Sequence, residues 1–243
     1  MKIKLLHIYP ELLNLYGEYA NLSILSKYLT EEGADVEIIS VSPGEHIPEG
    51  ADLVYIGSGT ESASFRALDA LKSESEALRS YYEGGTPILA TGNSFELFGK
   101  TVNDDKLGKM EGLSFFDFSV ERTHKKRFLG DAVFSCALIP EKIIGFVNKC
   151  STVNGVSSPL FSVEMGLGNN NSDPAEGMTE NHFYGTSLIG PLLVRNPSFC
   201  RYIMDLIYRI KGSAPDSKAD MELQNKAYDT ALNKLLERMK EAK

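Results

Sequence analysis

The chain has few cysteines, and none of them form a pair. Its three cysteines, Cys136, Cys150 and Cys200, are widely spaced among 243 residues. A disulfide framework and a cysteine-rich zinc site both need paired cysteines, so neither is predicted. The four histidines also lack the H-x-x-x-H and H-E-x-x-H spacings that are typical of metal sites. We therefore expect structural thiols, no metal and no other cofactor.

Long apolar runs and an excess of basic residues are lacking too. No uncharged apolar stretch approaches the ~20 residues that span a bilayer, and the N-terminal segment does not read as a signal peptide. The net charge is −8, whereas a nucleic-acid-binding surface needs a basic face that displaces counterions from phosphates. We expect a cytoplasmic protein that binds neither nucleic acids nor membranes.

A phosphate-binding loop is also missing. The sequence contains no G-x-x-x-x-G-K-[ST] motif, which holds the phosphates of ATP in P-loop enzymes. Any ATP-dependent step connected with this protein would therefore take place in a partner.

The first 91 residues do contain a regular alternation of strand and helix patterns. Strands are predicted at residues 2–9, 36–41, 53–56 and 87–91, and helices at 21–32 and 63–83. This alternation predicts a parallel sheet with right-handed crossovers and a site at the carboxyl ends of its strands. Shorter extended stretches at 130–134 and 143–147 indicate an antiparallel extension.

The C-terminal part is predicted to be helical. One helix follows Pro197, and residues 212–218 interrupt it. The last helix carries an apolar stripe of Tyr228, Leu232, Leu235 and Met239. Such a stripe is typical of a face that docks onto a core. We expect one domain over residues 1–211, with the helix of residues 212–243 packed on it.

The most informative segment is residues 88–99, ILATGNSFELFG. An apolar strand breaks at a small-residue turn and resumes with helical spacing, which is the arrangement of a nucleophile elbow. Gly92 stands at the turn, where a nucleophile would project over the helix N-terminus. Glycine has no side chain with which to attack.

Residues 88–99 resemble the A-x-C-G-G-x-Q-x-x-G segment of class I glutamine amidotransferases, in particular the glutaminase subunit of lipid II isoglutaminyl synthase and the cobyric acid synthase type. In that register Gly92 takes the place of the cysteine. Other segments resemble the same family: YPELLNLYGE at 9–18, DLVYIGSG at 52–59, GLGNN at 166–170 with EG at 176–177, and YGTSLIGPLL at 184–193.

The resemblance implies a flavodoxin-like α/β fold, with a doubly wound, mostly parallel sheet and a small antiparallel extension. It also implies a ligand-binding pocket formed by Gly57, Ser58, Gly59, Asn93 and Glu96, in which the glycine turn supplies the backbone N–H groups of an oxyanion hole. The general-base histidine of the family is replaced by Ile189. The family's G-F-E-N-H segment reads GFVNK at residues 145–149.

These replacements bear directly on the chemistry. A thiol attacks a glutamine carboxamide as a thiolate, and an adjacent imidazole takes its proton and later protonates the leaving ammonia. Because both groups are replaced, we expect a protein without glutaminase activity that acts as a binding or scaffold subunit. In the family, the partner is a Mur-ligase-like synthetase that amidates a peptidoglycan precursor, and the cobyric acid synthase type amidates corrinoids.

Two alternatives stay open. An active glutaminase or amidase would need a relocated nucleophile. One candidate is Ser94, which is more typical of a helix cap. The other is Cys150, whose thiol pKa the neighbouring Lys149 would lower. A sensor would instead keep the pocket and bind glutamine or another small amino acid without reacting. The polar segment 169–177 is expected to form either a solvated hairpin tip or part of a binding site.

Overall fold

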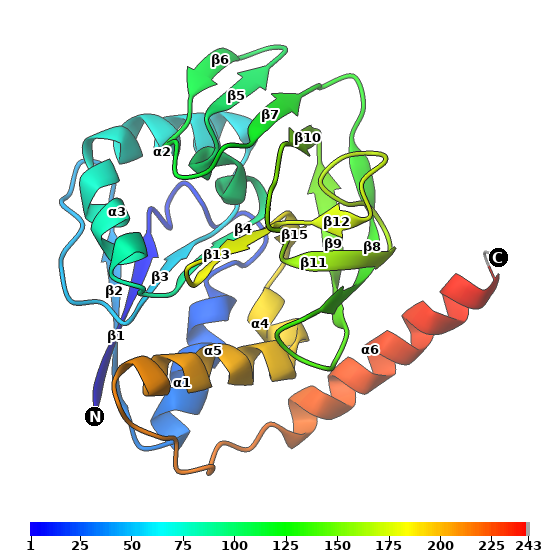
Figure 1. Ribbon diagram of the computed structural model, residues 1–243. Coiled ribbons are helices and arrows are strands. Elements are labelled where there is room, and N and C mark those ends of the chain that lie inside the picture. The colour runs from blue at the N-terminus through cyan, green and yellow to red at the C-terminus, as the bar shows by residue number, and fades with distance from the viewer. Residues whose placement is uncertain (242–243) are drawn as a thin grey trace.

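The computed structural model describes residues 1–241, which are organised around a six-stranded sheet with the order β13-β14-β4-β3-β1-β2 (Figure 1). The parallel strands are β1 (Lys2–Ile8), β2 (Asp35–Val41), β3 (Leu53–Ile56), β4 (Ile88–Thr91) and β14 (Phe183–Thr186). At the edge, β13 (Met178–Glu180) pairs with β14 in the antiparallel direction. Numbered among themselves, the parallel strands have the flavodoxin-like order 2-1-3-4-5, and the predicted fold class is confirmed.

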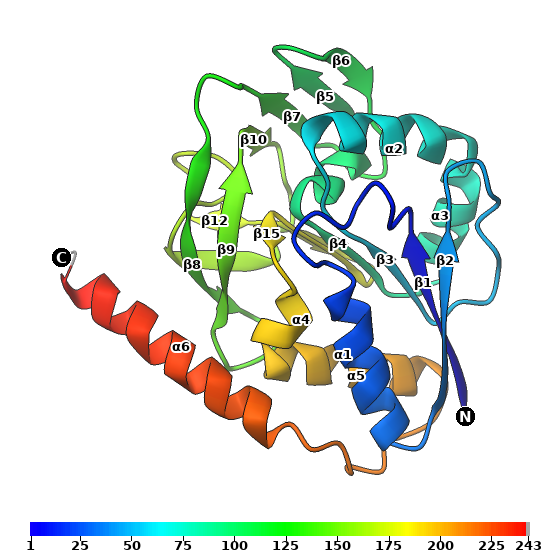
Figure 2. The ribbon, with the colours of Figure 1, turned by 180° about the vertical axis from the view of Figure 1, so that it is seen from behind.

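Helices cover both faces of this sheet (Figures 1 and 2). They are α1 (Ala20–Glu31), α4 (Leu192–Arg195) and α5 (Pro197–Ile210) on one face and α2 (Glu61–Ser73) and α3 (Ser75–Glu83) on the other. Leu5 and Tyr55 pack into the first layer, whereas Leu6 and Val54 pack into the second. Successive strand side chains point to opposite faces, so a continuous apolar run buries the sheet on both sides.

The predicted antiparallel extension forms two further sheets. The first has the order β10-β7-β5-β6 and consists of β5 (Thr101–Asp104), β6 (Gly108–Glu111), β7 (Ser119–Arg122) and β10 (Ser151–Asn154). The second has the order β12-β11-β8-β9-β15 and consists of β8 (Phe128–Cys136), β9 (Ile143–Lys149), β11 (Phe161–Met165), β12 (Ala175–Glu176) and β15 (Leu188–Ile189). Only β5 and β7 pair in parallel within the described part of these sheets.

Two helical segments differ from the sequence prediction. The continuous helix expected at 63–83 is divided at Glu74, whose backbone leaves the helical region. Its carboxylate accepts a hydrogen bond from the backbone N–H of Ile47 (2.9 Å) and lies 3.0 Å from Nδ1 of His46. These contacts come from a loop distant in sequence, which helical periodicity does not register. The segment after β4 is a 3₁₀-helix, η1 (Gly92–Phe98), instead of an α-helix.

The C-terminal helix α6 (Glu222–Glu241) runs diagonally past β8 and β9 (Figure 2). Its Tyr228 and Leu235 are buried with Val133 and Ile144 of these strands. The hydroxyl of Tyr228 also donates to the carbonyl of Lys142 (2.7 Å). None of the helices within residues 1–241 combines the length and the apolar composition of a membrane span.

A buried carboxylate, Glu18, links the segments that surround the end of the sheet. Its Oε2 accepts hydrogen bonds from the hydroxyl of Tyr55 on β3 (2.6 Å) and from the hydroxyl of Thr91 on β4 (2.5 Å). Its Oε1 accepts from the N–H of Gly190, directly after β15 (2.8 Å). Because each donor belongs to a different segment, Glu18 fixes the loop before α1, two central strands and the turn after β15 relative to one another.

The ionisation of Glu18 gives a prediction for stability. Burial outweighs its hydrogen bonds and raises the pKa of Glu18 above the ordinary value of 4.5. The folded protein therefore holds this proton more tightly than the unfolded chain, and the resulting stabilisation is present at low pH and lost as pH rises through the folded-state pKa. We expect Glu18→Gln to become more stable relative to the wild type between pH 4 and pH 7. Urea unfolding of both proteins across this range measures the difference, and a difference that does not change with pH would contradict the prediction.

Candidate functional site

A cavity of about 220 Å³ lies at the carboxyl ends of β3 and β4. Its walls include the turns that follow these strands, the loop before α1, the start of α2, parts of β7 and β9, and Cys150, which lies between β9 and β10. Most of the residues singled out from the sequence line it, among them Ser58, Gly59, Gly92, Asn93, Glu96 and Cys150. The fold thus brings the turns of two neighbouring strands together, as parallel strands do at one edge of a sheet.

Gly92 has the backbone conformation of an elbow but no space for a side chain. Its φ is +61°, in the left-handed region that favours glycine. A Cβ added here would lie 2.5 Å from Cβ of Ser58 and 2.9 Å from Cγ2 of Ile189, and closer still to the Ser58 hydroxyl. Ser58 and Ile189 therefore occupy the volume into which a residue at position 92 would project.

The glycine turn at 57–59 is bonded to Asn93. The N–H of Gly59 donates to Oδ1 of Asn93 (3.1 Å), and Nδ2 of Asn93 donates to the Gly59 carbonyl (2.8 Å). Both groups were expected to face a ligand, and here they bond each other. Gly57 is not among the described residues that line the cavity. An added Cβ on Gly57 would lie 2.9 Å from Cβ of Glu18, so this glycine permits the close approach of the loop before α1.

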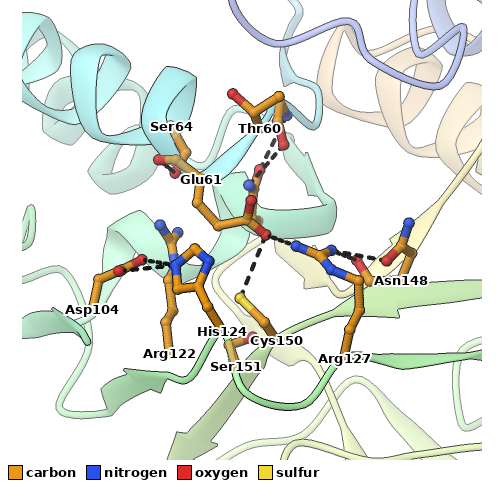
Figure 3. Close-up of polar contacts among 12 residues, drawn as sticks. Thr60, Glu61, Ser64, Asp104, Arg122, His124, Arg127, Asn148, Cys150 and Ser151 are labelled. Carbon is orange, nitrogen blue, oxygen red and sulfur yellow. Dashed lines mark hydrogen bonds and ion pairs between the residues drawn. The ribbon is translucent and has the colours of Figure 1, made fainter. Parts of the chain in front are cut away.

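Ile189, at the position of the expected base, is apolar and buried. It is 4% exposed and pairs with Phe146 across β15 and β9. Within residues 1–241, none of the four histidines lines the cavity. Nε2 of His124 instead lies 3.0 Å from the Asp104 carboxylate, outside the cavity lining (Figure 3).

The Ser94 hydroxyl is turned away from the site. Ser94 is fully buried, and its Oγ donates to the carbonyls of Ile56 and Thr91, both at 2.9 Å. The expectation that Ser94 caps the following helix is wrong, because a cap accepts a hydrogen bond from a backbone N–H. The side chain instead joins the ends of β3 and β4.

The Cys150 thiol faces the cavity but is held in its neutral form. Its Sγ lies 3.4 Å from Oε1 of Glu61, and burial together with this carboxylate raises the thiol pKa to about 12 (Figure 3). The idea that Lys149 lowers this pKa is wrong. The Nζ of Lys149 donates instead to the carbonyl of Gly168 (2.7 Å), and the charged group that reaches the thiol is the Glu61 carboxylate.

The guanidinium of Arg127 connects several walls of the cavity. Arg127 pairs with the Glu61 carboxylate at the start of α2, and its Nη1 donates to Oδ1 of Asn148 (2.8 Å). Asn148 in turn donates to the hydroxyl of Tyr16 (2.7 Å). Figure 3 shows the contacts of Arg127 with Glu61 and Asn148.

Glu96 belongs to a buried ion pair that the sequence analysis did not find. Its Oε2 accepts from Nε of Arg122 on β7 (2.7 Å), and its Oε1 accepts from the Ser151 hydroxyl (2.6 Å). The side chains of Arg122 and Glu96 are 0% and 2% exposed. A buried glutamate needs either a cationic partner or several hydrogen-bond donors, but nothing in the sequence identifies Arg122 as the partner of Glu96.

The segment 169–177 is solvated only in part. Asn169 and Glu176 are both fully buried. Asn169 exchanges two hydrogen bonds with the backbone of Gly177, and Glu176 accepts from the Ser187 N–H (2.7 Å) and the Thr186 hydroxyl (2.8 Å). The base of the hairpin thus supports the end of β14, and only its tip matches the expected solvated turn.

The packing around Gly92 leads to a second prediction. Gly92→Ala should reduce the free energy of unfolding by about 2 kcal/mol or more, because it combines a left-handed backbone with overpacking. In a Ser58→Gly background the same substitution should cost less, with a coupling of at least about 1 kcal/mol. Chemical denaturation of the four proteins in this double-mutant cycle provides the test. An equal cost in both backgrounds would show that Ser58 does not fill the position.

Comparisons with known proteins point to one protein family. The family model of the CobB/CobQ-like glutamine amidotransferase domain matches residues 4–197. The chain is 27% identical to subunit GatD of the glutamine-hydrolysing lipid II isoglutaminyl synthase of Streptococcus pneumoniae, over 96% of this chain and 88% of that protein. The GatD subunit of Staphylococcus aureus is 26% identical, over 98% and 96% of the two chains.

A solved structure shows the same fold. A glutamine amidotransferase from Thermotoga maritima superposes with a TM-score of 0.52 at 15% identity, covering 98% of this chain and 97% of that one. The family match extends over most of the chain and includes both turns that meet at the cavity. This protein therefore belongs to the CobB/CobQ-like glutamine amidotransferase domain family.

Proposed function

We propose that this protein is a glutamine amidotransferase-family subunit that does not hydrolyse glutamine and that structurally supports an amidating synthetase of the Mur-ligase type. The observation that carries the proposal is the packing at Gly92. The turn keeps the left-handed elbow conformation, yet Ser58 and Ile189 occupy the space of the missing side chain.

The other groups near the cavity do not supply the missing chemistry. Attack on a carboxamide requires a thiolate or an activated hydroxyl with a base in hydrogen-bond reach. The Cys150 thiol has a pKa of about 12, and its hydrogen-bonding neighbour is the Glu61 carboxylate, which disfavours a second negative charge. Ser94 donates to two carbonyls, with no histidine in hydrogen-bond reach of it in the described chain. These contacts argue against a relocated nucleophile.

A partner with ligase activity is supported by the relatives and by the chain itself. Both relatives are named as subunits of lipid II isoglutaminyl synthase. The present chain matches them over nearly its whole length but has no P-loop motif for an ATP-dependent step. A synthetase that activates a carboxyl group of a peptidoglycan precursor is the partner that we propose.

Absence of glutaminase activity is the direct test. The purified chain, alone and together with a Mur-ligase-like synthetase from the same organism, should release no ammonia from glutamine above a buffer control. An electrophilic glutamine analogue should leave Cys150 and Ser94 unmodified in mass spectrometry. Ammonia release that the analogue abolishes, or a single adduct on either residue, would overturn the proposal.

A rescue experiment tests whether Gly92 and Ile189 stand at the positions of the family's cysteine and histidine. The substitutions Gly92→Cys and Ile189→His alone would not suffice, because a Cβ at position 92 meets the Ser58 side chain. We therefore predict that Ser58→Gly, Gly92→Cys and Ile189→His together place a thiol beside an imidazole, which raises the thiolate fraction. The matched control carries Ser58→Gly and Gly92→Cys only. At pH 7 the thiol of the triple variant should react faster with iodoacetamide. Equal rates would mean that positions 92 and 189 do not face each other.

A further inference from the structure

Part of the outer face of the five-stranded sheet is left open by α6. This helix packs on Val133 of β8 and Ile144 of β9, and so crosses only one end of these strands (Figure 2). Because strand side chains alternate between the two faces, Leu129 and Phe146 point to the same side as Val133 and Ile144. Leu129 is 62% exposed and Phe146 is half-buried. The far end of this face therefore presents apolar side chains to solvent.

The loop before α1 continues this apolar surface. Leu129 lies opposite Asn148 in the pairing of β8 with β9, so their side chains are neighbours. Asn148 donates to the hydroxyl of Tyr16 (2.7 Å), and the adjacent Leu15 is 48% exposed. Leu15, Tyr16 and Asn148 also line the cavity. Together with Leu129 and Phe146 they form one surface beside the cavity, the β8–β9 face.

Basic residues border the β8–β9 face. Residues 125–127, KKR, are the one run of three basic residues in the sequence, and they end two positions before Leu129. The arginine of this run pairs with Glu61, and Asp131 on β8 pairs with Arg238 of α6. The two lysines are exposed and form no ion pair within residues 1–241. They leave unpaired positive charge beside the face, in a chain whose net charge is −8.

The charge of this border decides between two kinds of partner. An exposed apolar patch with a charged border is typical of a protein–protein interface. In a symmetric dimer of this chain, the patch would meet the same patch of a second copy. Both lysine pairs would then lie on one interface, and such like-charge contacts oppose association. A different protein with carboxylates around its contact surface has the complementary charge.

We infer that the amidating synthetase docks on the β8–β9 face, and that it presents an apolar patch bordered by carboxylates. The apolar patch packs on Leu129 and Leu15, and the carboxylates pair with Lys125 and Lys126. The inference rests on the proposed function, which calls for such a partner. It adds the surface that the partner contacts and the charge that the partner carries there.

Binding of the purified Mur-ligase-like synthetase from the same organism to the full chain tests the apolar contact. We expect Leu129→Glu to weaken the binding at least about tenfold, because it places a charge in the centre of the interface. The matched control is Leu223→Glu on α6, where the leucine is 82% exposed and lies outside the β8–β9 face. Its Kd should equal that of the wild type. Both leucines are exposed, so both variants should keep the melting temperature of the wild type.

A second pair of variants tests the charge of the border. Lys125→Glu with Lys126→Glu should weaken binding and reduce its dependence on ionic strength, because salt screens exposed charge contacts. Lys72→Glu with Lys109→Glu changes the net charge equally at exposed positions on α2 and β6. This control should bind the synthetase as the wild type does.

Several outcomes would overturn the inference. These are unchanged binding in Leu129→Glu, equal losses in the variants and their controls, and self-association of the wild type that Leu129→Glu abolishes. Leu129-dependent binding to vesicles of anionic phospholipid in place of the synthetase would also overturn it. If the wild type forms no complex with the synthetase, the proposed partner fails as well. Ammonia release from glutamine would overturn the proposed absence of glutaminase activity and leave the docking surface in place.

Discussion

The geometry of the cavity depends on the buried carboxylate of Glu18. Its two oxygens accept hydrogen bonds from Tyr55, Thr91 and Gly190, which lie on β3, on β4 and after β15. These three donors offset part of the cost of removing the carboxylate from water, since burial alone raises its pKa. The elbow turn begins one residue after Thr91, and Ile189 directly precedes Gly190. The Glu18 side chain therefore links the segment before Gly92 to the segment after Ile189, although Glu18 itself is not among the residues that line the cavity.

The fold was predictable because it depends on local patterns. Strands β1, β3 and β4 carry apolar residues on both faces, and this pattern, with helical segments between strands, is sufficient for a parallel sheet. The turn at Gly92 could be placed because an apolar strand ends there. The division of the helix at Glu74 could not be predicted. It occurs where the Glu74 carboxylate contacts His46 and Ile47, which lie on a loop distant in the sequence.

The interior of the site was less predictable, because its pairs form between distant segments. Glu96 could be identified as unusual, but its partner Arg122 belongs to the four-stranded sheet, whose position over the cavity is a tertiary property. Lys149, the sequence neighbour of Cys150, suggested a lowered pKa for the Cys150 thiol. In the structure the Lys149 amine bonds the carbonyl of Gly168, and Glu61 reaches the thiol instead. The role of Ser58 could not be predicted either. Its side chain fills the space beside Gly92, which follows a different strand.

The filling of the space at Gly92 has a consequence for the evolutionary history of the chain. Substituting the glycine first creates a steric conflict, and substituting Ser58 or Ile189 first restores no reactive group. On the proposed function, no single substitution among the three positions would therefore restore a thiol beside an imidazole. On the proposed function, the packing acts as an evolutionary ratchet: once three neighbouring positions had adapted to the absence of a side chain, selection could no longer recover the ancestral chemistry one step at a time.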